Sequence, residues 1–297
     1  MKDNATIGMS LNAADRWKGQ GAIFCTAVLW STSGLFIKLV DWHPLVIAGT
    51  RSFVAALFLL AVRLLFPPKT GSEKNRLLPL WLGAVVYIVT MITFVTANKL
   101  TSSANAIMLQ YSAPVWAALL GWLLVKEKPH WEHWGALVLV AGGMTLFFRD
   151  GLSTGHLFGD CLAILSGIFF GAHSVVLRMM KNGNPRDSML LAHVLNAVIS
   201  IPFIIIYTPH FTVPTVIPIV FMGLIQIGCS SILFAYGIKR VSAVQAMLTA
   251  MIEPVLNPVW VLAVTGEKPS ASALAGGGII IAAVAASSYI GKRREQR

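Results

Sequence analysis

Four polar side chains recur at every fourth residue near the carboxyl end of the chain: Gln245, Thr249, Glu253 and Asn257. In an α-helix this spacing puts them on one face, and residues 243–264 around them are otherwise mostly apolar. Such a stripe could line the path of a polar solute. The alternative interpretation is that Gln, Thr and Asn form hydrogen bonds to neighbouring helices and take no part in transport.

Of the four, Glu253 has the side chain that could take part in the most chemistry. It lies about ten residues into its segment, roughly 15 Å deep at ~1.5 Å per residue, where desolvation favours the neutral form of an isolated carboxyl group. Pro254 follows directly and removes a backbone donor, which loosens the helix. Three roles are open for Glu253: proton coupling, direct contact with a solute, or a buried ion pair with Arg51. Arg51 is the one arginine deep inside an apolar segment, and it needs an acceptor because it keeps its proton.

Five further residues complete the predicted substrate-binding set: Trp30, Phe170, His173, Gln110 and Tyr111. For aromatic residues in such segments, packing is the alternative to lining a route. His173, like His193 on the next segment, is more typical of a hydrogen-bonded packing residue than of a proton relay. Metal binding would require more ligands at fixed spacing, so we expect no metal and no cofactor.

Other classes of function lack their signatures. No Gly-x-Ser-x-Gly, His-Glu-x-x-His or paired aspartates occur in the apolar segments, which disfavours an intramembrane enzyme acting on a lipid or peptide. A phosphate-binding loop that would indicate ATP-driven transport is missing, as are the charged rings or carbonyl filter of a channel. Cys25, Cys161 and Cys229 are isolated in apolar segments and are expected to pack as small residues.

The composition indicates the elements that must position these residues. Of 297 residues, 56% are hydrophobic and 12% are charged, against about 25% charged in an average soluble domain. A helix needs about 20 mostly apolar residues to cross a bilayer. Ten such spans are expected, numbered in chain order: 19–39, 44–66, 78–98, 103–124, 131–148, 158–179, 188–207, 215–236, 243–264 and 270–290.

The spans form a sequence repeat with an offset of 140 residues. Pro114-Val115 and Glu127-Lys128-Pro129 recur as Pro254-Val255 and Glu267-Lys268-Pro269, and Trp30 corresponds to Phe170. Five spans are an odd number, so the second repeat enters from the opposite side. We therefore predict an all-α membrane protein whose ten transmembrane helices form two inverted five-helix repeats, the construction of secondary transporters that work by alternating access. The expected divisions are a leader (1–18), the repeats (19–150 and 151–290) and a basic tail (291–297).

The basic residues predict the orientation, because cytoplasmic loops are enriched in Lys and Arg. With both termini in the cytoplasm, only Lys38, Lys99, Arg149 and Lys268 of the 23 basic residues fall outside, and Arg51 lies within a span. The net charge of +11 is thus a topology signal, and nucleic acid is not an expected partner. The expected partners are a small-molecule solute, the lipid bilayer and, if Glu253 titrates, protons. The chain is expected to be a monomer or a homodimer, and Gly276-Gly277-Gly278 in span 10 could pack against span 5 or a second subunit.

The order of these features resembles the drug/metabolite transporter superfamily, EamA type. The resemblance rests on the two five-span repeats, the proline-containing fourth span ending in Glu-Lys in each, Arg51-Ser52-Phe53, Gly159-Asp160 and Glu253-Pro254-Val255. It covers about residues 19–290 and implies a metabolite transporter, often an exporter, of the bacterial inner membrane, with substrates that include amino acids. Ser31 after Trp30, where the family often has glycine, and His173 in span 6 depart from the pattern.

Overall fold

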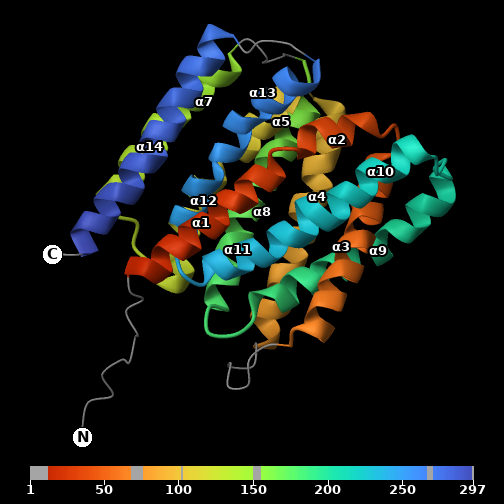
Figure 1. The fold of residues 1–297 in the computed structure, drawn as a ribbon, viewed down its shortest axis with the longest axis horizontal. Helices are drawn as coiled ribbons and strands as arrows, with labels where there is room; N and C mark the ends of the chain where they lie inside the picture. Colours follow the sequence, from red (N-terminus) through yellow and green to blue (C-terminus); the bar gives the residue numbers. More distant parts are fainter. Residues whose placement is uncertain (1–12, 68–75, 102, 150–154, 266–269, 296–297) are drawn as a thin grey trace, which may run out of the picture.

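The structure, a computed structural model, describes residues 13–67, 76–101, 103–149, 155–265 and 270–295. These residues form helices joined by short connections (Figure 1). The helices are α1 (Ala13–Trp30), α2 (Ser33–Leu39), α3 (Pro44–Leu65), α4 (Leu77–Leu100), α5 (Ser103–Gln110), α6 (Ala113–Leu120), the π-helical η1 (Gly121–Val125), α7 (Trp131–Phe148), α8 (Leu157–Met179), α9 (Pro185–Tyr207), α10 (Val213–Phe221), the π-helical η2 (Met222–Cys229), α11 (Ser230–Ile238), α12 (Ala243–Ala250), α13 (Ile252–Thr265) and α14 (Ala271–Glu295).

The expected all-α membrane fold is confirmed, and several spans are interrupted. Eight helical stretches of the described chain are long and apolar enough to cross a bilayer; α7 and the pair α12–α13 supply the other two expected spans. Spans 1 and 9 are each divided into two shorter helices, span 4 into α5, α6 and the π-helical η1, and span 8 into α10, the π-helical η2 and α11. Where a helix is divided within a bilayer, other groups must form hydrogen bonds with the backbone atoms that have lost their helical partners. These interruptions are therefore candidate positions for the functional site.

Glycines set the close approach of the last spans of the two repeats. Helices α7 and α14 lie side by side along one edge of the molecule (Figure 1). A Cβ added to Gly276 would lie 2.5 Å from the Gly143 carbonyl oxygen and 2.5 Å from the Phe147 backbone nitrogen. The glycines of span 10 therefore include one that packs against the equivalent span of the first repeat, as the first of the two sequence interpretations proposed.

Equivalent lysines show the inversion of the repeats directly. Lys99 at the end of α4 donates from Nζ to the Val40 carbonyl, 3.1 Å away, which follows the end of α2. Its repeat mate Lys239, after α11, donates to the Gly183 carbonyl, 2.7 Å away, which follows the end of α8. Each lysine thus joins the third span of its repeat to the first. The number of crossings between them is odd, so the two contacts lie at opposite ends of the bundle.

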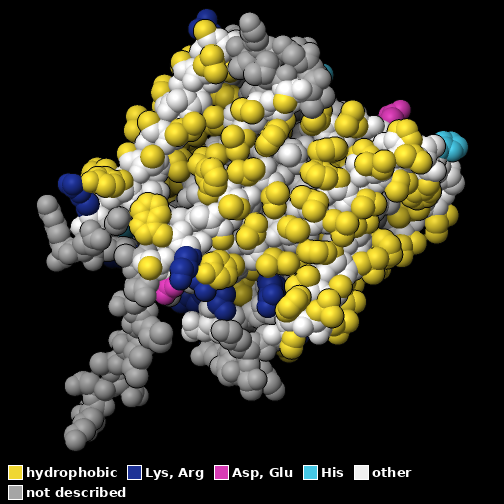
Figure 2. Space-filling model, viewed as in Figure 1, with side chains coloured by type: hydrophobic (Ala, Val, Ile, Leu, Met, Phe, Trp, Pro, Cys, Tyr) yellow, Lys and Arg dark blue, Asp and Glu magenta, His cyan; other side chains and the backbone are white. Residues whose placement is uncertain are grey.

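The outer surface is mostly apolar, as lipid requires. Figure 2 shows hydrophobic side chains over most of the visible face, with Lys and Arg gathered towards the end where α1 begins and α14 finishes. We call this the basic end, and its contacts join residues from both repeats. Arg63 pairs with Asp187 there, and α1 packs at Gly19 against Arg240. The charge distribution in three dimensions therefore follows the asymmetry in the sequence.

Candidate functional site

Spans 4 and 9 break at equivalent positions because each has a proline one turn beyond the break. Helix α5 ends at Gln110 and α12 at Ala250, 140 residues later. Proline has no backbone N–H, so Pro254 leaves the carbonyl of Ala250, four residues before it, without its helical donor. Pro114 does the same for Gln110. Both breaks therefore leave a carbonyl oxygen free for a partner outside its own helix.

Tyr111 fills that role for Ala250 and joins the two breaks. Its Oη lies 3.2 Å from the Ala250 carbonyl oxygen and also forms a hydrogen bond with Glu253 Oε2. Tyr111 belongs to the first repeat and Glu253 to the second, and both side chains are buried. The two predicted residues thus meet at the interface of the repeats, where the helix is interrupted in both spans.

The ion pair of Arg51 with Glu253, one of the three roles left open for this carboxyl group, does not form among the described contacts, where the carboxyl group is hydrogen-bonded to Tyr111. Arg51 on α3 is only 2% exposed, and its Nε has no hydrogen-bond partner. Tyr87 on α4 is near enough to interact electrostatically with both Arg51 and Glu253. The guanidinium and the carboxyl group thus belong to one polar region without a direct contact among the described residues.

A hydrogen-bonded network joins α9 to the residues of α3 next to Arg51. Asn196 donates from Nδ2 to Ser52 Oγ at 2.8 Å and to the Ala48 carbonyl at 3.0 Å. Nδ1 of His193 lies 3.3 Å from Ser52 Oγ, and His193 also interacts electrostatically with Arg51. Gly49 permits this contact between helices, since a Cβ there would lie 2.0 Å from Ser200 Cβ. The polar face of α9 is therefore directed against the helix that carries Arg51.

His173, on α8, makes one polar contact and one aromatic contact. Its Nδ1 lies 3.2 Å from the Gly83 carbonyl oxygen, and its ring stacks on Tyr87 with centroids 4.3 Å apart. The carbonyl can only accept, so Nδ1 must carry the hydrogen of the neutral imidazole. Nε2 is then an acceptor, and it has no partner. The contact of Nδ1 and the stacking on Tyr87 fit the packing interpretation, while Nε2 keeps a buried lone pair without a hydrogen bond.

Trp30 and Phe170, equivalent positions in the two repeats, contact each other. Their ring centroids are 5.4 Å apart in an edge-on arrangement, and Phe234 lies 5.4 Å from Trp30 on another side. Trp30 Nε1 donates to Ser230 Oγ at 2.8 Å. Gln226, in η2, donates to the Trp30 carbonyl at 3.4 Å, and its Oε1 has no partner. This aromatic contact therefore borders the π-helical stretch, a feature often found at functional sites.

The remaining predicted residues have more local contacts. Gln110 donates from Nε2 to Ser166 Oγ at 2.8 Å, a link between α5 and α8. Thr249 donates to the Gln245 carbonyl at 2.9 Å within α12, and Gln245 is half-buried. The Asn257 side chain lies outside the part that the structure describes. The predicted stripe on one continuous helix is wrong in detail, because the break at Met251 divides it between α12 and α13.

One ion pair joins three spans at the basic end. Arg178, in the last turn of α8, donates from Nε to Glu127 Oε1 at 2.7 Å. Its Nη1 donates to the carbonyls of Ile238 at 3.0 Å and Lys239 at 2.9 Å. Spans 4, 6 and 8 are thereby tied together, across both repeats, at the end of the molecule that carries most of its basic side chains.

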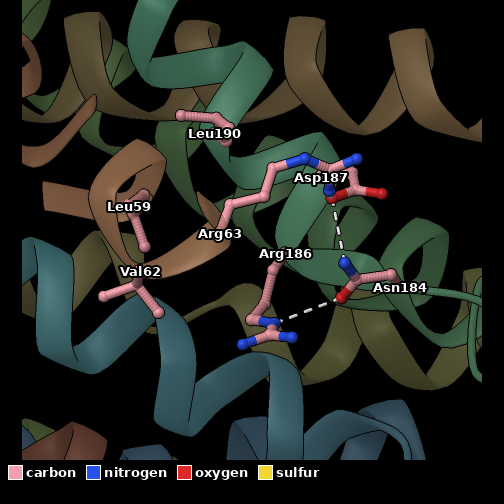
Figure 3. Close-up of a pocket in the computed structure, with 7 residues that line it drawn as sticks. All are labelled: Leu59, Val62, Arg63, Asn184, Arg186, Asp187 and Leu190. Atoms are coloured by element: carbon pink, nitrogen blue, oxygen red, sulfur yellow. Dashed lines mark hydrogen bonds and ion pairs between the residues drawn. The ribbon is translucent and has the colours of Figure 1, made fainter. Parts of the chain in front are cut away.

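A small pocket at the basic end is less suited to a solute. Its lining residues are Leu59, Val62, Arg63, Asn184, Arg186, Asp187 and Leu190 (Figure 3). Its polar groups bind one another: Asp187 accepts from Arg63 and, at 2.9 Å, from Asn184, which in turn accepts from Arg186 at 3.2 Å. We therefore place the candidate site at Tyr111, Glu253 and the polar region around Arg51.

Gln226 was not singled out from the sequence, although a polar amide within the apolar span 8 was a signal for it. Tyr87 was only one of the aromatic residues in apolar segments for which packing is the alternative to lining a route. Its proximity to both Arg51 and Glu253 depends on how the spans pack, which no local pattern contains.

Comparisons with known proteins agree with this architecture. Residues 17–149 and 157–289 each match the EamA-like transporter family. The uncharacterized transporter YwfM of Bacillus subtilis is 27% identical over 267 residues, with 86% of this chain and 88% of YwfM covered. An uncharacterized transporter of Archaeoglobus fulgidus is also 27% identical, with 90% and 94% covered. Human solute carrier family 35 member G1 is 30% identical, with 52% of this chain and 46% of the human protein covered. A crystal structure with 18% identity has a TM-score of 0.79 and covers 94% of this chain, and 99% of its own chain is covered.

Proposed function

Because the chain belongs to the EamA-like transporter family, we propose that it is a secondary transporter that moves a small polar or amphipathic metabolite by alternating access. An amino acid or a related compound fits this class. We place the protein in a bacterial inner membrane, with the basic end and both termini in the cytoplasm, and with export as its direction. The positive-inside asymmetry of the loops supports the orientation.

The observation that carries the proposal is the contact of Tyr111 with the break in span 9. It joins discontinuous helices of inverted repeats, and secondary transporters place their substrate sites at such positions near the bilayer midplane. A solute can compete there for the carbonyl of Ala250 and the carboxyl of Glu253. Its binding would loosen the link between repeats. This supplies the differential interaction with two conformations that any ligand-driven change requires.

Proton coupling through Glu253 is part of the proposal. The Tyr111 hydroxyl has one hydrogen but two acceptors beside it, the Ala250 carbonyl and the Glu253 carboxyl. Both contacts are satisfied when Tyr111 donates to the carbonyl and a protonated Glu253 donates to Tyr111. Loss of the proton would leave two oxygens competing for one hydrogen. The proton would therefore stabilise the contact between the repeats, and its release would favour separation.

The test is flux of a panel of amino acids and small metabolites in proteoliposomes, with and without a pH gradient. We expect flux of at least one solute that responds to the gradient, and a Glu253→Gln variant whose flux no longer does. Asp41→Asn, which neutralises an exposed carboxylate between α2 and α3, should keep the wild-type profile. Flux of no solute would contradict transport, and an unchanged pH profile in Glu253→Gln would reject coupling through this residue.

A further inference from the structure

We propose that Arg51 is the receptor for a carboxylate group of the transported solute, held between Arg51 and His193. This inference rests on the proposed function and names the class of solute: a small organic monoanion, or a zwitterion with a carboxylate. We define the Arg51 cluster as Arg51, Tyr87, His173, His193 and Gln226.

The charge of Arg51 lacks a counter-ion within the described chain. The residue is 2% exposed, its Nε has no acceptor, and the ion pairs of the described residues do not include it. Glu253, a possible partner from the sequence, is hydrogen-bonded to Tyr111 instead. A buried charge without an anion is costly, and within a membrane such residues mark solute pathways. An anion supplied from outside the chain would remove this cost.

The hydrogen-bond network makes His193 a second donor. Ser52 Oγ accepts from Asn196 Nδ2 at 2.8 Å and lies 3.3 Å from His193 Nδ1. Among the described contacts, His193 Nδ1 is the acceptor to which the Ser52 hydroxyl group can donate its hydrogen. Accepting it requires the hydrogen of the neutral imidazole to be on Nε2. That nitrogen is buried and has no partner, so Arg51 Nε and His193 Nε2 are two unused donors in one cluster.

The neighbours of these donors define the shape and charge of the ligand. Tyr87 lies edge-on to His193, with centroids 5.3 Å apart, and α3 packs against η2 where a Cβ on Gly223 would approach the Arg51 carbonyl to 2.9 Å. Gln226, one turn after Gly223, presents an unpartnered Oε1, an acceptor suited to an ammonium or hydroxyl group of the same solute. A single fixed positive charge matches a monoanion. A dianion such as a phosphate ester would bring a second negative charge without a partner, which is costly in a buried site.

Thermal unfolding of the purified full-length protein tests the inference without requiring transport. The probes are matched pairs that differ in charge: benzoate and benzamide, and L-phenylalanine and L-phenylalaninamide, with inorganic phosphate as the alternative anion. We expect at least one carboxylate to raise the melting temperature more than its amide. Arg51→Gln should weaken that effect by roughly 10- to 100-fold in apparent affinity, the worth of a hydrogen bond to a charged group. Arg63→Gln, on the same helix but outside the cluster, should leave the effect unchanged.

The ligand-free variant separates a receptor from a structural charge. If Arg51 is a receptor for an anion that the ligand-free protein lacks, Arg51→Gln removes an uncompensated buried charge. The variant should then melt at or above the wild-type temperature. A clearly lower melting temperature would mean that Arg51 stabilises the fold, and would overturn the inference. Equal stabilisation by amides, stabilisation by phosphate alone, or no response to any probe would also overturn it.

Flux measurements keep this inference distinct from the transport proposal. Carboxylate binding that depends on Arg51, without flux of any solute, would support the receptor and contradict transport. Flux that is equal for carboxylates and amides, and unchanged in Arg51→Gln, would support transport and contradict the receptor.

Discussion

At the scale of residues, the sequence predicted which side chains matter better than it predicted their partners. Glu253 stood out because a carboxyl group deep in an apolar span is expensive, and Tyr111 was named with it. Their contact depends on the relative position of spans 4 and 9, which no local pattern contains. For the same reason, similar depth alone left an ion pair of Arg51 with Glu253 as one of three open roles, and the ion pairs of the described residues do not include it.

The Tyr111 contact predicts a measurable coupling energy. Tyr111→Phe removes one hydroxyl and leaves the Ala250 carbonyl and Glu253 without that partner, so we expect a loss of about 1–3 kcal/mol in the free energy of unfolding. In a double-mutant cycle with Glu253→Gln, the two losses should not add. Tyr236→Phe, at a partly exposed ring, is the matched control and should change stability little. Additive losses in the thermal or chemical unfolding of the four proteins would show that the hydroxyl and the carboxyl act independently.

At the scale of elements, the positions of the ten spans were predictable because hydrophobic length and breakers determine them. The divided spans 1, 4 and 9 and the π-helical η2 were not predicted, although Pro114 and Pro254 weaken the helix where spans 4 and 9 break. A proline permits a break, but tertiary partners such as Tyr111 for the Ala250 carbonyl make it stable. Span 1 divides after Trp30 without a proline, and Ser31 there accepts from Trp260 Nε1 at 2.7 Å.

Replacing Pro254 by alanine tests the role of the break. The variant regains an N–H that can donate to the Ala250 carbonyl, which then competes with Tyr111. We expect an unchanged or higher melting temperature, because proline is unfavourable within a helix, together with reduced flux. Pro202→Ala, at an exposed position inside α9, should gain stability without losing flux. Full flux in Pro254→Ala would mean that the freed carbonyl has no part in transport.

Two glycine substitutions should have opposite effects. A Cβ at Gly171 would lie 2.6 Å from the Ala113 carbonyl oxygen and 2.9 Å from the Ala117 nitrogen, beside the break in span 4. Gly171→Ala should therefore cost about 1–3 kcal/mol by overpacking. Gly142 has open space at its Cβ position, so Gly142→Ala should gain about 0.5–1 kcal/mol from helix propensity. Melting temperatures that move in the same direction would contradict this packing.

At the scale of the whole molecule, the inverted repeats were predictable from the offset of 140 residues and the odd number of spans. The contacts that hold the ends of the bundle together were not predictable, because they join distant segments. Examples are the bonds of Arg178 to Glu127 and to the carbonyls of Ile238 and Lys239. That group of bonds crosses between the repeats and ties spans 4, 6 and 8 together at the basic end. In the alternating-access cycle that we propose, opening that end would require breaking it.

Weakening the contacts of Arg178 should make the interior of the bundle more accessible from the basic end. In a background without Cys25, Cys161 and Cys229, a Thr249→Cys thiol should react faster with a membrane-impermeant maleimide applied at the basic end when Arg178 is changed to Gln. Glu127→Gln should have a smaller effect, because Arg178 keeps its two carbonyl partners. Unchanged labelling rates in both variants would show that this ion pair does not control access.

Alternating access is tested most directly by cross-linking the basic end shut. Glu127→Cys and Arg178→Cys, introduced together in the cysteine-free background, can be joined by a reducible bifunctional thiol reagent in proteoliposomes while solute flux is recorded. We predict that flux stops on cross-linking and returns on reduction, while each single-cysteine protein is unaffected by the reagent. Sustained flux through protein that is fully cross-linked would contradict a carrier whose repeats must separate at this end.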